Sequence, residues 1–490
     1  MIGRCFFEND DETIVTDLEG PAFGQRHVQS VLLFLGIAIN YMTKYSASIS
    51  LVAMTNASTT NPNFPQYNWT EAEKSYILSS FFWGYVVTQL PAGYVCKRFG
   101  AKVTLFAATL GSSLAGLILP FTVKWGDWQI FCAVRVLQGL FQGFDITAAY
   151  AHVAKWSPVE ERNRLGAIVS SGIECGTLLG MLVSGLIATS SMGWPGISYT
   201  SCAFGLIWCL FWEIFASNTP NKSKFISAEE RNYINTSLSK KRAAESNTSK
   251  SIPTPWRVLL GSSAVWALLC TRCAEAWCFT TIQASIPTYM SGVFGMNMEN
   301  NTLYSALPFI VLWIMSYVYL ILADLLLKYD VLTLKSLRKT FNSIAFWIPA
   351  MCLFAIGFLE VEQQIFAGVL LIAIVALNAG NMIGSGLNVL DLAPNHTAIL
   401  MSFINSVATI MPILTPLVAG AIVSDNSNIR QWQIVFAICG SVYIVTNMIY
   451  LIWGTTDVQP WNDPDFQESR KDIQSVGNID GRSKESKVDV

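Results

Sequence analysis

The sequence predicts an all-helical protein that crosses a membrane twelve times, in two halves of six helices each. Three observations indicate this fold class. The 490-residue chain is 52% hydrophobic and only 13% charged, whereas about 25% charged is usual for soluble domains, and its mean hydropathy is +0.42. Twelve apolar stretches approach the length of about 20 residues that a spanning helix needs. A polar stretch, residues 217–257, separates six of these stretches from the other six.

The first half begins after polar residues that include Gln25 and Arg26, with no small-residue cleavage site, so the first apolar run is not expected to be a signal peptide. The fourth run, RVLQGLFQGFDITAAYAHVAKW (135–156), is expected to form one helix. The fifth contains SSGIECGTLLGM (170–181), whose glycines allow close helix contact. The six spans are expected near 29–53, 74–94, 102–122, 128–154, 165–189 and 197–216.

The second half repeats one feature of the first. A short charged turn, GYVCKRFGAK (93–102), follows the second span, and another, LADLLLKYD (322–330), follows the eighth. Two parallel six-helix repeats are typical of transporters whose substrate site lies between the halves at mid-membrane. The six spans are expected near 260–290, 303–327, 340–360, 365–389, 397–423 and 432–454.

The polar segments define the remaining organisation. Within the linker, ISAEERNYI predicts a short amphipathic surface helix with Ser227 as its N-cap. The tail after Trp461 is charged and is expected to be disordered. The chain therefore divides into an N-terminal tail (1–28), a first half (29–216), a linker (217–257), a second half (258–455) and a C-terminal tail (456–490).

The distribution of basic residues predicts the orientation. If the N-terminus is cytosolic, the inner segments hold 25 of the 31 lysine and arginine residues, and the outer segments hold only Lys74, Lys124 and Arg430. This asymmetry follows the positive-inside rule, so both termini are expected in the cytosol. The glycosylation sequons at Asn56 and Asn68 then fall in the first outer loop. We expect the plasma membrane rather than a lysosomal or vesicular membrane.

Other functional classes find no support in the sequence. There is no nucleophile motif, phosphate-binding loop or metal-ligand cluster, and the 3 histidines are scattered, so an enzyme, a cofactor or a metal site is not expected. Cys270-x-x-Cys273 is interpreted as two small apolar residues rather than a redox pair. A net charge of −2 gives no indication of a nucleic-acid partner. The expected partners are membrane lipid and a small anion, and the protein is expected to be a monomer.

Several motifs resemble a known family. GYVCKRFGAK is similar to the loop signature of the major facilitator superfamily, with Lys97 in place of the usual aspartate. Three longer stretches and QPWNDP (459–464) resemble solute carrier family 17, which holds sialin, the vesicular glutamate transporters and the sodium/phosphate cotransporters. The likeness is greatest to the invertebrate branch named inorganic phosphate cotransporters. The three stretches are SSFFWGYVVTQLPAGY (79–94), KWSPVEERNRL (155–165) and NVLDLAPNHTAILM (388–401). The resemblance implies a twelve-helix, alternating-access fold and an anionic substrate.

Lys44 is the first candidate for substrate binding. An ionisable group inside a span is costly and is a functional candidate by default. The resemblance implies an arginine that holds the substrate anion here, and lysine keeps the charge but loses the two-pronged donor. An alternative is a lysine that extends to the membrane interface. The wall residues expected beside it are Tyr41, Tyr85, Gln89 and Trp277.

The fourth span carries a cation that fits the family pattern and an anion that does not. Arg135 is interpreted as a gating or helix-pairing cation, or equally as a substrate contact. The family glutamate associated with proton coupling is Gln142 here, and its histidine is Tyr150. We expect either that Asp145, three residues beyond Gln142 on the same helix, replaces that carboxylate or that proton coupling is absent. His152 is expected to be solvated at the cytosolic end.

Charges in other spans are candidates for coupling or gating. Glu174 is expected to balance Lys44 or Arg135, or to bind a coupling cation. In the seventh span, Glu275 stands where the vesicular glutamate transporters have an arginine, and Arg272 lies one turn before it. An i,i+3 pair of these two would neutralise itself and would make a dicarboxylate-like substrate less favourable.

The inner ends of two spans complete the candidate set. Asp324, Asn388 and Asp391 are expected to hold an inner gate, and Val389 replaces the family histidine.

The leading hypothesis is a secondary active transporter of a small anion, inorganic phosphate or an organic monocarboxylate, driven by sodium or protons. The alternatives are a transport-inactive sensor or scaffold, suggested by the departures at Lys44, Gln142, Tyr150, Glu275 and Val389, and an uncoupled anion channel.

Overall fold

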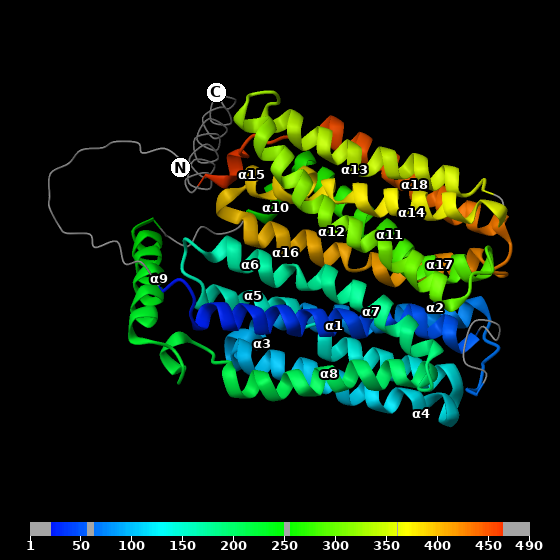
Figure 1. Cartoon of the computed structure of the whole chain (residues 1–490). Coiled ribbons are helices and arrows are strands. Elements are labelled where there is room, and N and C mark those ends of the chain that lie inside the picture. The colour runs from blue at the N-terminus through cyan, green and yellow to red at the C-terminus, as the bar shows by residue number, and fades with distance from the viewer. Residues whose placement is uncertain (1–20, 56–62, 249–254, 360, 464–490) are drawn as a thin grey trace, which may run out of the picture.

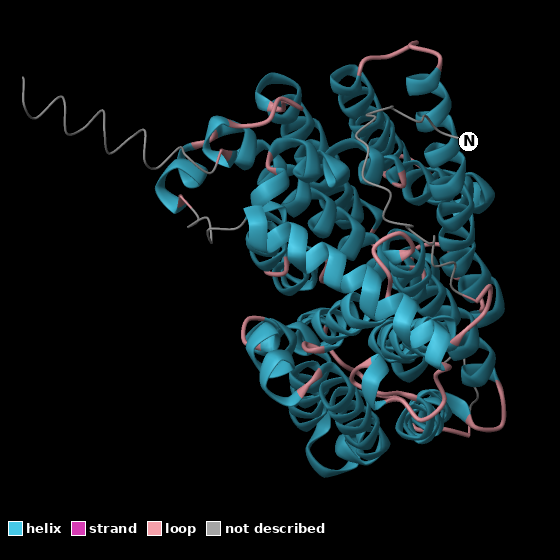
Figure 2. Ribbon diagram, turned by 90° about the vertical axis from the view of Figure 1, so that its left-hand side faces the viewer, coloured by secondary structure: helices cyan, strands magenta, loops and turns pink. Residues whose placement is uncertain are grey.

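A computed structural model describes residues 21–55, 63–248, 255–359 and 361–463, and within them the chain is helical without strands (Figures 1 and 2). The expected all-helical fold class is therefore confirmed. The helices up to the linker are α1 (Gln25–Thr55), α2 (Glu71–Gln89), α3 (Ala92–Phe99), α4 (Ala101–Gln142), α5 (Asp145–Trp156), α6 (Arg162–Ser170), α7 (Gly172–Thr189), α8 (Gly193–Phe215), the 3-10 turn η1 (Pro220–Lys222) and α9 (Ala228–Thr248).

The second part of the chain is built in the same way. Its helices are α10 (Trp256–Gly261), α11 (Ser263–Gly292), α12 (Met298–Lys328), α13 (Leu334–Ile356), α14 (Gln364–Asn378), α15 (Leu387–Leu392), α16 (Thr397–Ala408), α17 (Met411–Ile422) and α18 (Ile429–Trp453). Short helical turns connect some of them, namely η2 (Val361–Gln363), η3 (Met382–Gly386), η4 (Pro394–His396) and η5 (Pro460–Asn462). In Figure 1 the helices up to α8 lie side by side in one group, and those from α10 onward form a second group above them.

Each of the twelve expected spans coincides with a helix or a run of consecutive helices. In the described part of the chain, 8 stretches are long and apolar enough to cross a membrane, and one of these, Ala101–Trp156, contains two expected spans. The other three expected spans correspond to α1, α2 with α3, and α11. These three helical regions are more polar because they carry candidate residues such as Lys44, Gln89 and Arg272.

The fourth span differs from the expected single helix. α4 covers the third expected span and the first part of the fourth, with a kink at Gly126 and Asp127, whose backbone angles are not helical. At the kink, Trp69 Nε1 donates a hydrogen bond of 2.6 Å to Asp127 Oδ1. A second interruption follows Gln142, which is the last residue of α4, and α5 begins at Asp145. Gln142 and Asp145 therefore lie on different helices, and the expectation of one continuous helix was wrong.

Glycines set the distance between neighbouring helices in the first half. α1 packs against α7, and α2 packs against α4. A Cβ atom added at Gly176 of α7 would collide with the carbonyl oxygen of Ala38 in α1, and one added at Gly139 of α4 would collide with that of Phe81 in α2. The close contact expected from the glycines of the fifth span is thus confirmed.

We call the end of the bundle that holds residues 63–70 the outer end, and the opposite end the inner end, after the predicted orientation. The two halves share one apolar cluster, to which Ile49 and Met54 of α1, Ile77 of α2, and Ile286 and Phe309 of the second half belong. The first-half members come from the outer ends of their helices. The halves are therefore packed together at the outer end.

At the inner end each half has its own apolar cluster. Leu33 of α1 and Trp212 of α8 belong to a cluster of the first half. Leu268 of α11 and Leu400 of α16 belong to a separate cluster of the second half. The two halves therefore share one apolar cluster at the outer end, whereas at the inner end their apolar clusters are separate.

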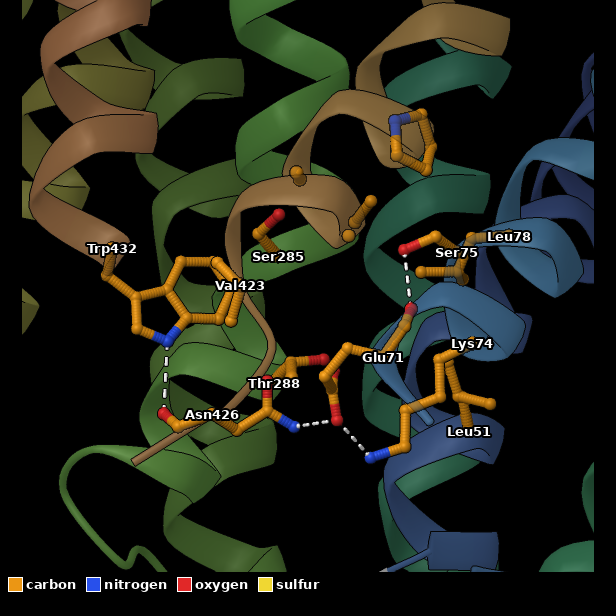
Figure 3. Close-up of a pocket in the computed structure, with 14 residues that line it drawn as sticks. Leu51, Glu71, Lys74, Ser75, Leu78, Ser285, Thr288, Val423, Asn426 and Trp432 are labelled. Carbon is orange, nitrogen blue, oxygen red and sulfur yellow. Dashed lines mark hydrogen bonds and ion pairs between the residues drawn. The ribbon is translucent and has the colours of Figure 1, made fainter. Parts of the chain in front are cut away.

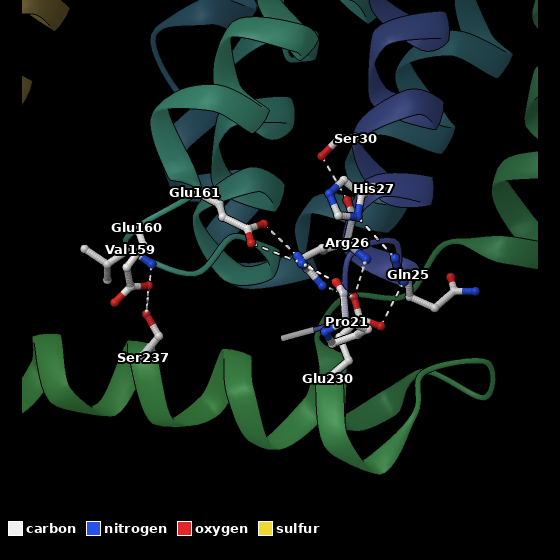
Figure 4. Close-up of polar contacts among 11 residues, drawn as sticks. Pro21, Gln25, Arg26, His27, Ser30, Val159, Glu160, Glu161, Glu230 and Ser237 are labelled. Atoms are coloured by element: carbon white, nitrogen blue, oxygen red, sulfur yellow. Dashed lines mark hydrogen bonds and ion pairs between the residues drawn. The ribbon is translucent and has the colours of Figure 1, made fainter. Parts of the chain in front are cut away.

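The linker helix α9 docks on the inner end of the first half (Figure 4). Arg26 at the start of α1 lies between Glu161, at 2.7 Å, and Glu230 of α9, at 3.2 Å. Glu230 also accepts the backbone N–H groups of Gln25 and Arg26 and so caps α1. Ser227 accepts a hydrogen bond from the backbone of Glu230, which confirms it as the cap of α9, and α9 is longer than the expected short helix.

Candidate functional site

The side chain of Lys44 lies within a group of aromatic rings from α1 and α2. Its ammonium nitrogen is 4.8 Å from the ring centroids of both Phe82 and Tyr85, 4.9 Å from that of Tyr41 and 5.3 Å from that of Tyr45. Such distances permit cation–π attraction. We call Lys44 and its rings, Tyr41, Tyr45, Phe81, Phe82 and Tyr85, the Lys44 cage.

The Lys44 cage lies at the boundary between the two halves. Lys44 is only 9% exposed, so it does not extend to the membrane interface. Ile413 of α17, in the second half, packs against the cluster formed by Phe81, Phe82 and Tyr85, and α1 packs against α11. No hydrogen bond or ion pair to the described residues holds the Lys44 ammonium, and the hydroxyls of Tyr41 and Tyr85 also lack such partners. The ammonium and these two hydroxyls are thus unengaged donors.

Arg135 lies behind the cage. It is 3% exposed, and its guanidinium donates to the backbone oxygen of Lys44 at 3.2 Å and to the side chain of Gln138 at 3.3 Å. The guanidinium carbon is 4.9 Å from the ring centroid of Phe81. Arg135 therefore holds α4 against α1 and supports the cage from outside it, which fits the helix-pairing interpretation of this residue.

Asp145 approaches the cage from the start of α5. It is 1% exposed and close enough to interact electrostatically with Lys44, Tyr41 and Tyr85. One of its carboxylate oxygens accepts the backbone N–H of Ile146 at 2.6 Å. Gln142, one helix earlier, donates instead to Ser112 at 2.8 Å. The carboxylate near Lys44 is therefore supplied by Asp145 rather than from position 142.

Two further acidic residues reach the cage region from other helices. Glu174 of α7 is within electrostatic range of Tyr41. Glu275 of α11 is within electrostatic range of Tyr45 and forms an ion pair of 2.7 Å with Arg272. The expected self-neutralising pair on this helix is thus present. Arg272 also donates to Asn405 of α16 at 3.1 Å.

The remaining expected wall residues have buried polar atoms without hydrogen-bond partners. Oε1 of Gln89 and Nε1 of Trp277 are both in this state within the described part of the chain. A buried polar atom without a partner is costly, so such atoms are candidates for contact with water or a ligand. Gln89 ends α2, whereas Trp277 packs against the cluster shared by both halves.

The expected inner-gate residues stay within the second half. Arg338 of α13 holds Asp391 of α15 with two hydrogen bonds, of 2.8 and 3.3 Å. Asn388 donates to the hydroxyl of Tyr450 at 2.8 Å, and Asp324 is exposed. The contacts of Asp391 and Asn388 therefore brace the second half internally, and a gating role for these residues stays a prediction.

The surroundings of His152 differ from the prediction. It was expected to be solvated, but it is fully buried, and its ring lies 2.9 Å from Gln29 of α1 and between Trp156 and Trp212. Only the tertiary structure brings these tryptophans together, so no local signal in the sequence indicated the burial. The family position of this histidine, Tyr150, is exposed and shares a hydrogen bond of 2.7 Å with Ser170.

A hollow lined by both polar and apolar side chains lies at the outer end, where the two halves meet (Figure 3). Glu71 of α2 accepts hydrogen bonds from Lys74 at 2.6 Å and from Asn426, in the second half, at 2.7 Å. Glu71 precedes the predicted span, and burial raises the pKa of its carboxyl, although the charge of Lys74 opposes the shift. We call Glu71, Lys74 and Asn426 the outer latch. The sequence did not indicate this cluster, because Asn426 lies 355 residues beyond Glu71 in the chain.

The other expectations concern modification and metals. Asn68 is exposed, as a glycosylation site requires, and Asn56 lies outside the described residues. The described residues include no group of three or more histidine, cysteine or acidic side chains placed to hold a metal ion. Cys270 and Cys273 are both free.

Comparison with known proteins identifies related sequences and folds. Residues 33–390 match the family described as the Major Facilitator Superfamily. A protein of Drosophila melanogaster named "Putative inorganic phosphate cotransporter" is 32% identical over 478 residues, which cover 93% of this chain and 89% of that protein. Vesicular glutamate transporter 3 of Danio rerio is 31% identical over 462 residues, which cover 93% of this chain and 77% of that protein.

A solved structure has the same fold. The crystal structure of a D-xylose-proton symporter matches with a TM-score of 0.67, and the match covers 88% of this chain and 100% of the symporter. The sequence identity is 14%, so this likeness concerns the arrangement of the helices alone.

Proposed function

The chain belongs to the major facilitator superfamily and, within it, to solute carrier family 17, and from this premise we propose that it carries a small anion that binds at Lys44. The protein is a multi-pass membrane transporter, as its family and its apolar helices indicate. The observation that supports the proposed site is the Lys44 cage, whose ammonium is nearly buried and has no ion-pair partner.

The chemistry of the cage suits an anion that is bound and later released. A buried ammonium strongly favours an ion pair, because little water competes for it. The ring faces stabilise the ammonium while the site is empty, so the cation need not be held by a permanent carboxylate. Lysine offers one compact charge rather than the two-pronged donor of arginine, so the cage would restrict the orientation of the anion less than an arginine would.

Alternating access would follow from the division of the chain into the halves 29–216 and 258–455. The two halves pack together at the outer end and have separate apolar clusters at the inner end. Rocking of one half against the other about the Lys44 cage would expose the anion to each side in turn. The linker helix α9 would move with the first half, because its Glu230 pairs with Arg26 of α1.

The driving ion is the second part of the proposal. Asp145 is the acidic residue that interacts electrostatically with the Lys44 ammonium. An anion that pairs with Lys44 would neutralise the ammonium charge that stabilises the Asp145 carboxylate. Asp145 would then take up a proton more readily, so binding of the anion would be coupled to binding of a proton. Sodium coupling is the alternative, with Glu174 as the candidate ligand.

We further propose that the protein works in the plasma membrane, with both termini in the cytosol.

The experiment that tests this function is uptake by proteoliposomes that contain the purified full-length chain. Labelled phosphate and labelled organic monocarboxylates are supplied while a sodium gradient and a proton gradient are imposed separately. Saturable uptake that one of the gradients accelerates is the expected result. Absence of uptake for the whole panel would refute the proposal, and binding without uptake would identify a sensor instead. A conductance far above carrier turnover would identify a channel.

A further inference from the structure

Two cysteines that are 161 residues apart in the chain meet inside the second half. Cys278 of α11 is 0% exposed and Cys439 of α18 is 1% exposed, and both are free. The thiol of Cys278 donates a hydrogen bond of 3.4 Å to the backbone oxygen of Cys439, and the two thiols lie within hydrogen-bonding range of each other. The two residues therefore face each other across the contact between α11 and α18.

Cys439 also borders a small hollow between α11, α17 and α18, which has room for about one water-sized molecule. Thr281 and Trp277 line the same hollow. The thiol of Cys439 donates to Thr281 Oγ1 at 3.5 Å, and Nε1 of Trp277 is buried without a hydrogen-bond partner in the described part of the chain. A buried polar atom in this state indicates contact with a small polar molecule. The hollow therefore gives a small uncharged oxidant a place beside the Cys439 sulfur.

The sequence draws attention to a different pair, Cys270 and Cys273, which lie on one helix and are both free. Side chains three residues apart on a helix have their Cβ atoms about 5–6 Å apart, whereas a disulfide needs a separation of about 3.5–4.5 Å. A bond between these two cysteines would therefore distort α11. Cys278 and Cys439 come from two helices, so a bond between them leaves the hydrogen bonds within each helix in place.

From these contacts we propose that Cys278 and Cys439 form a redox-sensitive dithiol site, which hydrogen peroxide closes into a disulfide that ties α11 to α18. The Cys439 sulfur, which borders the hollow, attacks one peroxide oxygen while the O–O bond breaks, which gives a sulfenic acid and one water. The Cys278 sulfur then attacks the sulfenic sulfur, the S–O bond breaks, and the hydroxyl leaves with the Cys278 proton as a second water. The two thiols together lose two electrons, and one peroxide is reduced to two waters.

The disulfide would fix a helix that lies at the boundary between the halves. α11 packs against α1 of the first half and against α17 and α18 of the second. A covalent bond between residues far apart in the chain also restricts the unfolded state and so stabilises the folded one. The oxidised protein should therefore be more stable than the reduced one. Neither the site nor this effect depends on which anion the protein carries.

The test treats the purified full-length chain with hydrogen peroxide, blocks the remaining thiols by alkylation and maps the peptides by mass spectrometry without reduction. We expect a cross-linked peptide pair that contains Cys278 and Cys439 and that disappears after treatment with dithiothreitol. The melting temperature should rise by about 3 °C on oxidation and fall again on reduction.

Variants examine the order of the two steps. In Cys278→Ser the sulfenic acid on Cys439 has no partner, so dimedone should label Cys439 after peroxide treatment. In Cys439→Ser the first step is lost, so Cys278 should stay unlabelled. Neither variant should show the rise in melting temperature. The control, Cys270→Ser with Cys273→Ser, should form the cross-link and become more stable as the wild type does.

The mapping of the wild type decides the inference without any variant. A folded wild-type chain that shows no Cys278–Cys439 cross-link after peroxide treatment would overturn the site. A cross-link between Cys270 and Cys273 in its place would do the same. A rise in melting temperature that persists in Cys278→Ser would assign the stabilisation to another reaction, and labelling of Cys278 by dimedone in Cys439→Ser would overturn the order of attack.

Discussion

The sequence predicted the charge of Lys44 but only part of its aromatic surroundings. The sequence indicated a cation in mid-span, and the resemblance to the family implied a role in anion binding. The five rings around the ammonium come from α1 and α2, and the sequence predicted only Tyr41 and Tyr85 among them. Tyr45, Phe81 and Phe82 were missed because aromatic residues in a span are expected to face lipid or core, and only the packing of the two helices directs them to Lys44.

Asp145 is the residue for which sequence and structure together sharpen the hypothesis. The sequence predicted one helix for Gln142 and Asp145, but α4 ends at Gln142 and α5 begins at Asp145, whose carboxylate lies within electrostatic range of Lys44. A pattern read at helical spacing could not predict the break, since nothing in FQGFD other than Gly143 marks it.

We predict that Asp145→Asn abolishes proton-driven uptake but keeps anion binding. Asparagine cannot take up a proton, and it retains the size of the side chain. The measurement is uptake by proteoliposomes with and without an inward proton gradient. Ser112→Ala, which removes the hydrogen-bond partner of Gln142, serves as a control that should stay responsive to the gradient. If Asp145→Asn responds to the gradient as the wild type does, Asp145 has no part in coupling.

At the scale of helices, small residues decide how closely the elements approach. We predict that Gly176→Ala lowers stability by about 1–3 kcal/mol, because its Cβ atom would collide with the backbone of Ala38 and force α7 away from α1. The measurement is the melting temperature of the purified protein.

The control for this prediction is Gly166→Ala in α6, where an added Cβ atom meets no atom within 4 Å. Alanine favours a helix over glycine by about 1 kcal/mol, so this control should be neutral or more stable. Equal melting temperatures for the two variants would contradict the close contact of α1 with α7.

The docking of α9 depends on a buried ion cluster. Arg26 and Glu230 are each 2% exposed, and removal of one partner from a buried pair typically costs about 3–5 kcal/mol. Arg26→Met and Glu230→Gln should therefore each lower the melting temperature markedly, and the double variant should lose less than the sum of the two. Glu213→Gln is the control. It breaks the pair with Lys102, but Glu213 is 61% exposed, so a change below about 1 kcal/mol is expected. Additive losses in the double variant would exclude a direct pairing.

At the scale of the whole molecule, the sequence predicted well where the long helices lie, because long apolar runs and their flanking charges are local features. It predicted less about the tertiary contacts. Arg338 was not singled out as the partner of Asp391, and His152 was expected in solvent. Both depend on helices that are distant in sequence, so composition and spacing carry no information about them.

We predict that the outer latch makes the closure of the outer end depend on pH. Glu71 faces Lys74 of its own helix and, from the second half, Asn426 and the charge of Asp425. Burial raises the pKa of Glu71 above its usual 4.5 in the closed arrangement, and exposure to water on opening would return it toward that value. The closed state then binds the proton more tightly, so acidification from the raised pKa down to about the usual value should stabilise closure.

This prediction is measured as a distance between spin labels placed at Gln66 and Ser427, on a variant without native cysteines. The fraction with the short distance should rise as the outer pH falls. Glu71→Gln should lose this dependence, because glutamine does not titrate. A pH response that persists in Glu71→Gln would assign the effect to another group.

The central claim is that Lys44 holds the transported anion, and the most direct test is anion uptake by proteoliposomes that contain wild type, Lys44→Arg or Lys44→Gln. The account predicts saturable uptake by the wild type, retained uptake with an altered KM in Lys44→Arg, and loss of uptake in Lys44→Gln that is folded by its melting temperature. Undiminished uptake by folded Lys44→Gln would contradict the claim.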